Sequence, residues 1–188
     1  FHIVPNVVNT DLFHLNPSEN DPEESFELLH VSSLSEEQKN ISGILRALVH
    51  VFPQCPKLRV TIVGDGDPLP HQELAEKLGV SNHVSIEGEI ALEEVAQRMR
   101  SAHALLLFSN FENFPCVIPE AWSSGIPVIS TNVGGIAEHL TAERGILIER
   151  GDEPALSKAI IAMVQGPPSQ ILNSSELRKM AKATFSIE

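Results

Sequence analysis

The sequence predicts an α/β fold, a doubly wound parallel sheet of the Rossmann-like type. Short apolar runs alternate with segments of helical periodicity almost throughout the 188 residues. Six repeats of a strand followed by a helix are typical of a parallel sheet that carries helices on both faces. Hydrophobic residues make up 42% of the chain, which is enough to bury the core of one sizeable domain.

The expected strands are short apolar runs that stop at a glycine, a polar turn or a helical segment. "FELLHVSS" is the first of them, and "KLRVTIVGDG" runs into a glycine turn. "HALLLFS" is continuously apolar, as expected for a strand that is covered on both faces. In chain order, the strands are expected over 26–33, 57–66, 83–89, 103–109, 126–131 and 145–149.

The expected helices carry apolar residues three and four positions apart, and several of them end at a glycine or proline. In "NISGILRALVHVF" this spacing links Ile41, Ile44, Leu45 and Leu48, and Pro53 ends the segment. The later segments follow the same pattern, with "GPPS" breaking the chain before the last one. In chain order, the helices are expected over 40–52, 71–79, 91–102, 115–125, 134–141, 153–165 and 174–185.

Charge and cysteine content limit the class of protein. The chain has 25 Asp and Glu against 13 Lys and Arg, a formal net charge of −12. This argues against nucleic acid or an anionic membrane as the main partner, because both need a dense cationic face. The two cysteines, Cys55 and Cys116, form no C-x-x-C motif, which favours a reduced, cytoplasmic setting. The eight histidines show no metal-binding spacing, so we expect no metal site.

Turns that follow the strands are the candidate functional positions, because parallel sheets of this type bind ligands at the carboxyl ends of their strands. Lys39, at the amino end of the helix expected from residue 40, is either part of an anion site or a solvated lysine offset by Glu36 and Glu37. Gly64 in "VGDGDP" and the glycine pair 134–135 either let a ligand approach the backbone or serve as ordinary packing turns.

The stretch "SNFENFPCVIPEAWSSGIPVIS" holds two acids, Glu112 and Glu120, with seven residues between them. They flank an expected helix start, where unpaired amides form an anion site and carboxylates can accept bonds from sugar hydroxyls. Alternatively, the acids simply complement the helix dipole. Cys116 is either an activated thiol or, as we prefer, a small packing residue. The candidate amides belong to Phe114, Pro115, Cys116, Val117 and Ile118.

Five motifs, in this order, resemble the C-terminal, donor-binding domain of GT-B glycosyltransferases, the retaining group 1 family. They are "IVPNVVNTDLF", "LHVSSLSEEQKN", "VTIVGDGDP", "VSIEGEI" and "AHALLLFSNFENFPCVIPEAWSSGIPVISTNVGGIAEHL". Three departures stand out. Ser33 replaces the usual arginine, with one extra residue before Lys39; Asn113 and Pro115 occupy common glycine positions; and Asn9 replaces a frequent aspartate.

The resemblance implies that the ligand is a nucleotide-diphosphate sugar such as a UDP- or GDP-sugar, bound as a substrate without a further cofactor. It implies that Glu112 contacts hydroxyls of the donor sugar and that Glu120 holds the ribose. Lys39 and the amides from Phe114 to Ile118 would hold the diphosphate, near Ser33. Gly64 and the turn at Gly88, Glu89 and Ile90 would frame the base.

The resemblance also implies how the chain is organised. Residues 1–25 would form a linker strand and an exposed loop, and residues 26–188 the nucleotide-sugar-binding core. The N-terminal domain that carries most of the acceptor site, for a sugar or glycolipid, would be absent, and with it any peripheral membrane contact. We therefore expect a retaining hexosyltransferase of polysaccharide or glycoconjugate synthesis as the full-length protein, and an inactive isolated domain. A sugar-nucleotide epimerase of similar fold and a non-catalytic nucleotide-binding module stay open as alternatives.

Overall fold

Six parallel strands form one sheet in the computed structural model, which describes residues 7–16 and 24–186. Neighbouring strands follow the order β3-β2-β1-β4-β5-β6. The chain therefore moves outward from β1 to β3, returns to the centre at β4 and then moves outward in the opposite direction. The predicted doubly wound sheet is confirmed, and its switch point lies between β1 and β4. The strands are β1 (Phe26–Val31), β2 (Leu58–Val63), β3 (Val84–Glu87), β4 (Ala104–Leu107), β5 (Val128–Thr131) and β6 (Gly145–Ile148).

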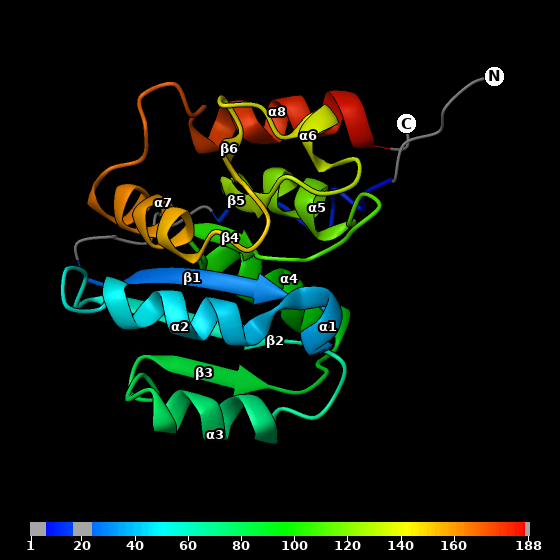
Figure 1. Cartoon of the computed structure of the whole chain (residues 1–188). Helices are drawn as coiled ribbons and strands as arrows, with labels where there is room; N and C mark the ends of the chain where they lie inside the picture. Colours follow the sequence, from blue (N-terminus) through cyan, green and yellow to red (C-terminus); the bar gives the residue numbers. More distant parts are fainter. Residues whose placement is uncertain (1–6, 17–23, 187–188) are drawn as a thin grey trace.

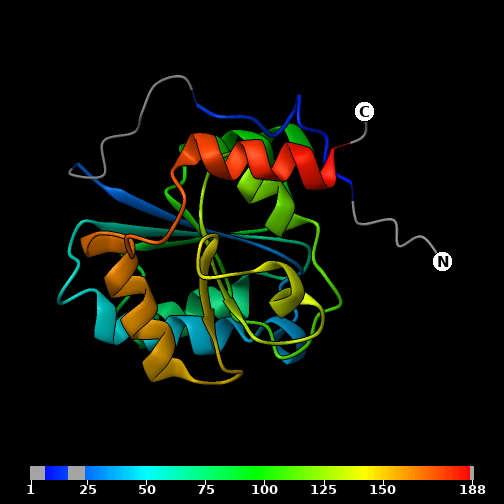
Figure 2. The same ribbon diagram turned by 90° about the horizontal axis from the view of Figure 1, so that it is seen from above.

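Helices connect the strands and cover both faces of the sheet (Figures 1 and 2). All seven expected helices are present, and α1 is an additional one. They are α1 (Glu36–Lys39), α2 (Ile41–Val51), α3 (Leu69–Lys77), α4 (Leu92–Ser101), α5 (Val117–Ser123), α6 (Ile136–His139), α7 (Glu153–Gln165) and α8 (Ser174–Phe185). The bounds of α7 and α8 are as predicted, and those of the other five differ by a few residues.

The sheet separates two apolar cores. One core packs α2, α3 and α7 against one face, and the other packs α4, α5, α6 and α8 against the opposite face. In Figure 2 the strands lie between α2 and α7 on one side and α8 on the other. Strand β4 serves both cores, since Leu106 belongs to the first and Leu105 and Leu107 to the second. Side chains of a strand point alternately to its two faces, which explains why this strand is continuously apolar.

The helix α1 was not predicted, because four residues are too few to show a helical period. Ser35 accepts a bond from the Gln38 amide at its start, and Asn40 ends it with a φ of 52°. Asparagine tolerates this left-handed conformation better than most residues, and its side chain also accepts from the Gly43 amide at the start of α2. Asn40 thus separates two helices where the sequence predicted a loop and one helix.

The motif "IVPNVVNTDLF" (residues 3–13), expected to supply the linker strand within residues 1–25, forms no strand over the part that the structure describes, residues 7–13. Within residues 7–13, pairing is limited to one parallel bridge between Val8 and Ser186. The Asn9 side chain then accepts bonds from the Asp11 and Leu12 amides, which turns the chain. Residues 3–6, and most of the predicted exposed loop over 16–25, lie outside the described residues.

Candidate functional site

The switch point of the sheet brings Lys39 and Glu112 together. Lys39 is the last residue of α1, after β1, and Glu112 lies in the turn after β4. The Lys39 Nζ donates to Glu112 Oε1, and the Ser109 hydroxyl donates to the same oxygen at 2.8 Å. The two charged side chains are only 10% and 7% exposed. The alternative of a solvated lysine is therefore wrong, since Lys39 is buried and paired.

Hydrogen bonds to backbone carbonyls hold the two turns at this spacing. The Asn110 amide donates to the Gln38 carbonyl at 2.8 Å, and its side-chain Nδ2 donates to the Glu37 carbonyl at 2.9 Å. From the next strand, the Thr131 hydroxyl donates to the Ser109 carbonyl at 2.8 Å. The α1 segment that carries Lys39 is thus joined to the turn that carries Glu112.

An uncharged histidine lies beneath the pair. His30 of β1 is fully buried, and its Nδ1 lies 2.8 Å from the Leu106 carbonyl, which can only accept, so Nδ1 carries the proton. The Nε2 lies 2.6 Å from the Ser32 hydroxyl. Burial, aided by the charge of Lys39, lowers the pKa of His30 to about 4. Near neutral pH His30 is therefore uncharged, and it adds no charge next to the Lys39–Glu112 pair.

The glycine pair in the turn after β5 packs directly on the turn that carries Glu112. The Gly135 amide donates to the Asn113 carbonyl at 2.7 Å. A Cβ added to Gly134, whose φ is 56°, would lie 1.8 Å from the Glu112 carbonyl oxygen. Of the two roles left open by the sequence, close packing is therefore the one that this geometry requires at Gly134.

Gly134→Ala is expected to destabilise the fold by about 1–3 kcal/mol more than Gly151→Ala, because only the first substitution forces a side chain into backbone. Gly151 is the matched control: its φ is 75°, and an added Cβ would meet nothing within 4 Å. Both changes carry the left-handed strain of roughly 1–2 kcal/mol. Urea unfolding of the two variants gives the difference, and equal costs would contradict the close packing.

The helix α5 begins at Val117, two residues later than expected, with Cys116 as its N-cap. This corrects the predicted set of amides. Pro115 has no amide hydrogen, and its carbonyl accepts from the Ile118 amide at 3.1 Å. The amides of Cys116 and Val117 donate to no oxygen within residues 7–16 and 24–186. Phe114 packs its ring on His139, with centroids 4.4 Å apart.

Glu120 and Cys116 lie close together at the start of α5. Burial raises the pKa of Glu120 to about 7. Burial, with the nearby charge of Glu120, also raises the pKa of the Cys116 thiol. A raised pKa disfavours the thiolate, which argues against an activated thiol at Cys116. Cys116 is also exposed, so it is not the packing residue that we preferred.

The remaining predicted positions lie along the same carboxyl edge. Ser33 is half-buried in the turn after β1. A Cβ on Gly64, after β2, would lie 1.6 Å from the Ser32 carbonyl oxygen, so close strand packing alone explains this glycine. Gly88, after β3, has open space around it, and Ile90 packs against the core. None of these contacts tests a role in framing a base.

Two residues at this edge were missed by the sequence reasoning. Ser109 holds the Glu112 carboxylate, as described above. Arg150, in the turn after β6, donates from Nη1 to the Asn110 carbonyl at 3.4 Å. The only signal in the sequence was their position, since each directly follows a predicted strand or ends it.

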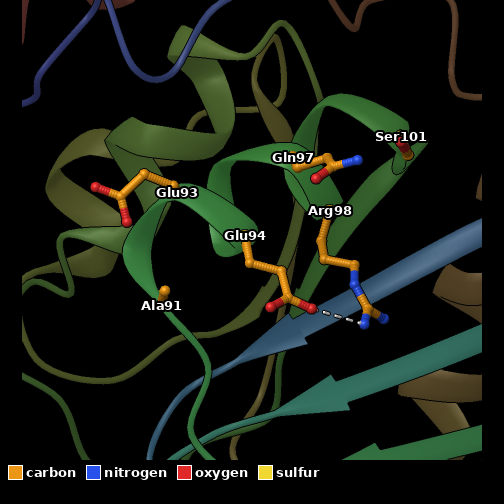
Figure 3. A pocket seen from close by; sticks show the side chains of 6 residues that line it. All are labelled: Ala91, Glu93, Glu94, Gln97, Arg98 and Ser101. Atoms are coloured by element: carbon orange, nitrogen blue, oxygen red, sulfur yellow. Dashed lines mark hydrogen bonds and ion pairs between the residues drawn. The ribbon is translucent and has the colours of Figure 1, made fainter.

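A hollow of about 550 Å³ lies along α4, apart from these turns (Figure 3). Figure 3 shows Glu94 and Arg98 joined across it, with Glu93 pointing away from them. Arg98 also makes two bonds to Glu87, at 3.0 and 2.9 Å. The hollow thus contains a satisfied ion-pair cluster, and it shares no residue with the Lys39–Glu112 site.

Within residues 7–16 and 24–186, no helix is both long and apolar enough to cross a bilayer. The same residues contain no group of three or more His, Cys, Asp or Glu side chains placed to hold a metal ion.

Comparison with known proteins identifies the family. The sequence model described as glycosyl transferases group 1 matches residues 25–166, well over half of the chain. The chain belongs to this glycosyltransferase family. A relative from Schizosaccharomyces pombe, the phosphatidylinositol N-acetylglucosaminyltransferase gpi3 subunit, is 31% identical over 139 residues, which are 73% of this chain and 30% of that protein.

Solved glycosyltransferases share the fold of this family member. The Anabaena protein HepE, in complex with UDP and glucose, matches with a TM-score of 0.84 and 23% identity over 98% of this chain and 53% of its own. The C-terminal domain of a group 1 family protein (LpcC) from Francisella tularensis matches with a TM-score of 0.82 and 15% identity, over 96% of this chain and all of its own. The chain therefore has the fold of one half of a GT-B glycosyltransferase. The matched part covers 30%, 26% and 14% of the length of the first three curated relatives.

Proposed function

We propose that this chain is the donor-binding half of a glycosyltransferase whose substrate is a nucleotide-diphosphate sugar. The observation that carries the proposal is the buried Lys39–Glu112 pair at the switch point of the sheet, in a chain of this family. Ligands of doubly wound sheets bind at that point. Relatives of the same fold were crystallised with UDP and with UDP-glucose, which supports a nucleotide sugar as the donor.

Each side chain at the edge has a role in this proposal. Lys39 and the amides of Cys116 and Val117 bind the diphosphate, since all three donors lie in segments that follow the carboxyl ends of β1 and β4. Glu112 accepts from hydroxyls of the donor sugar, and Glu120 accepts from the ribose. The base lies over the turns after β2 and β3, at Gly64, Gly88 and Ile90. The donor is a substrate, and no further cofactor takes part.

The proposed reaction transfers the sugar with retention of its anomeric configuration. The bond from the anomeric carbon to the diphosphate oxygen breaks, and its electron pair leaves with the diphosphate. An acceptor hydroxyl oxygen bonds to the same carbon, and its proton passes to the departing diphosphate oxygen. Lys39 and the two amides stabilise the negative charge that develops on the diphosphate, which lowers the barrier.

The acceptor is bound by a further domain in this proposal, and we propose a polysaccharide or glycoconjugate acceptor. Three large apolar side chains are exposed on the carboxyl-edge turns or at the helix starts beside them. Leu69 is 55% exposed, Leu92 is 54% exposed and Phe111 is 51% exposed. Exposed apolar groups on the same edge fit a surface that faces another part of the protein. The chain by itself then binds the donor but does not complete the transfer.

We also propose that the protein works in the cytoplasm. Cys55 and Cys116 are both free thiols, as expected for a reducing compartment. Fractionation of the tagged protein tests this, and recovery in an oxidising compartment would contradict it.

Calorimetric titration of the 188-residue chain with UDP, GDP and ADP tests the function. One of the three is expected to bind. A second titration with the nucleotide-diphosphate sugar of the same base should show tighter binding than the free diphosphate, and Glu112→Gln is expected to remove that preference. Glu76→Gln, at an exposed position on α3, is the matched control and should bind as the parent does. Failure of all three diphosphates to bind would favour the non-catalytic module, in line with Ser33 at the usual arginine position. Conversion of the donor sugar without an acceptor would favour the epimerase.

A further inference from the structure

The paired side chains at the switch point carry no net positive charge, although the proposed ligand is an anion. The Lys39 ammonium is already paired with Glu112, so the two side chains together carry no net charge. His30 beneath them is neutral, and Ser33 adds no charge. The diphosphate of a nucleotide sugar carries two negative charges, and the whole chain carries a formal −12. A second cation at this edge would stabilise such a ligand, because charges near a protein surface interact more strongly than they do in bulk water.

Arg150 is placed to supply that cation. It lies in the turn after β6, and β5 separates β6 from β4 in the sheet. Its Nη1 nevertheless reaches the Asn110 carbonyl at 3.4 Å, in the turn after β4. The side chain therefore crosses the carboxyl end of β5 toward the switch point. Asn110 also bonds the α1 segment, so the guanidinium lies against the junction of the two turns that carry Lys39 and Glu112.

The guanidinium of Arg150 is not neutralised by a carboxylate. Among the residues that the structure describes, it forms no ion pair, and its neighbour Glu149 instead accepts from Asn132 Nδ2 at 3.3 Å. By contrast, Arg46 and Arg98 are both paired with glutamates. Arg150 is also exposed, and its one side-chain bond to the described residues uses a single N–H, so the other four donors are available to a ligand at this edge.

We propose that Arg150 binds the diphosphate of the donor, in the place of the cation that Ser33 does not provide. This inference rests on the proposed function and assigns one more residue to the same site. A guanidinium can bind two phosphate oxygens at once, which a lysine cannot do. The ligand then lies between Lys39 on the α1 side and Arg150 on the β6 side, with the Asn110 turn below it.

The test compares Arg150→Gln with the parent chain and with Arg46→Gln as the matched exposed-arginine control. Calorimetry measures the dissociation constants for UDP, GDP and ADP, and titration followed by NMR measures those for uridine, guanosine and adenosine. Arg150→Gln is expected to weaken the preferred diphosphate by about tenfold, because a bond to a charged group is lost. The corresponding nucleoside, which has no phosphate, should bind as before. Arg150→Lys should give an intermediate loss.

The outcomes separate the inference from the function on which it rests. If the parent chain binds no diphosphate, the proposed function fails and this inference fails with it. If the parent binds but Arg150→Gln binds equally well, the inference alone fails. An equal loss for the diphosphate and the nucleoside would overturn it too, because Arg150 would then only position the Asn110 turn. Selective loss of the diphosphate, with unchanged binding by Arg46→Gln, supports it.

Discussion

Replacing Lys39 with methionine is expected to lower the free energy of unfolding by about 3–5 kcal/mol, since it leaves a buried carboxylate without its partner. Glu112 is only 7% exposed in the folded chain and would keep one bond, from the Ser109 hydroxyl. Methionine has nearly the length of lysine, so the substitution leaves little cavity. The loss in the free energy of unfolding therefore measures the effect of removing the charge. Urea unfolding at neutral pH measures the effect.

An exposed ion pair on the same molecule gives the matched control. Arg46 pairs with Glu153, and these side chains are 46% and 31% exposed. Arg46→Met should cost no more than about 1 kcal/mol, because solvent screens such a pair. The double variant Lys39→Met with Glu112→Gln should recover part of the loss, since no unpaired charge is then buried. Equal losses in the free energy of unfolding for Lys39→Met and Arg46→Met would show that the buried pair stabilises the fold no more than the exposed pair does.

The buried pair has a consequence for donor binding in the proposed function. Glu112 can accept from the hydroxyls of a sugar only if it shares or releases the Lys39 ammonium. A diphosphate beside Lys39 would offer that ammonium a second anionic partner, and would so reduce the cost of the exchange. Sugar and diphosphate are therefore expected to bind more tightly when they are linked than as separate molecules.

The strands were predictable because each is an apolar run long enough to be recognised locally. The structure shortens several of them, and "FELLHVSS" ends as a strand at Val31 rather than at Ser33. The last residues of such runs leave the sheet to form the carboxyl-edge turns. The local sequence does not show at which residue a strand leaves the sheet, because that residue depends on the neighbouring strands and turns.

The contacts of the site were less predictable, because they join residues far apart in the chain. Lys39 and Glu112 are 73 positions apart, and Arg150 reaches Asn110 across 40. The glycine pair at 134–135 signalled close approach, but not that the approaching group is the Glu112 carbonyl. Sequence placed these residues on one edge, since all follow strands of a parallel sheet. The pairing itself is a result of the strand order.

Glu120→Gln is expected to change how the stability of the fold depends on pH. Below about pH 4.5 the carboxyl group is protonated in both the folded and the unfolded chain. Since burial raises the folded pKa from 4.5 to about 7, the unfolded chain loses its proton first as the pH rises. The free energy of unfolding therefore falls between pH 4.5 and 7 by up to about 3 kcal/mol, and the loss is complete above that range.

The Glu120→Gln variant cannot ionise at this position. The difference between its free energy of unfolding and that of the parent chain should therefore rise by about that amount between pH 5 and pH 8. Urea unfolding at both values measures it, and taking the difference between the chains cancels the contribution of His30. The low pKa of His30 acts in the opposite direction, since stability is lost as the pH falls from 6.5 to about 4. Glu76→Gln, at an exposed position on α3, is the reference for the same substitution.

The same proton links pH to nucleotide binding, because an ionised carboxylate accepts bonds from ribose hydroxyls more strongly than a protonated one. If Glu120 holds the ribose, the affinity for the preferred ribonucleotide should rise through about pH 7 in the parent chain, beyond any rise in Glu120→Gln. The comparison removes the ionisation of the phosphate itself, which both chains share. A 2′,3′-dideoxynucleotide should show no difference between the two chains. A parallel rise in both chains with the ribonucleotide would assign the ribose to another residue, and would leave Glu120 as a buried acid of structural effect alone.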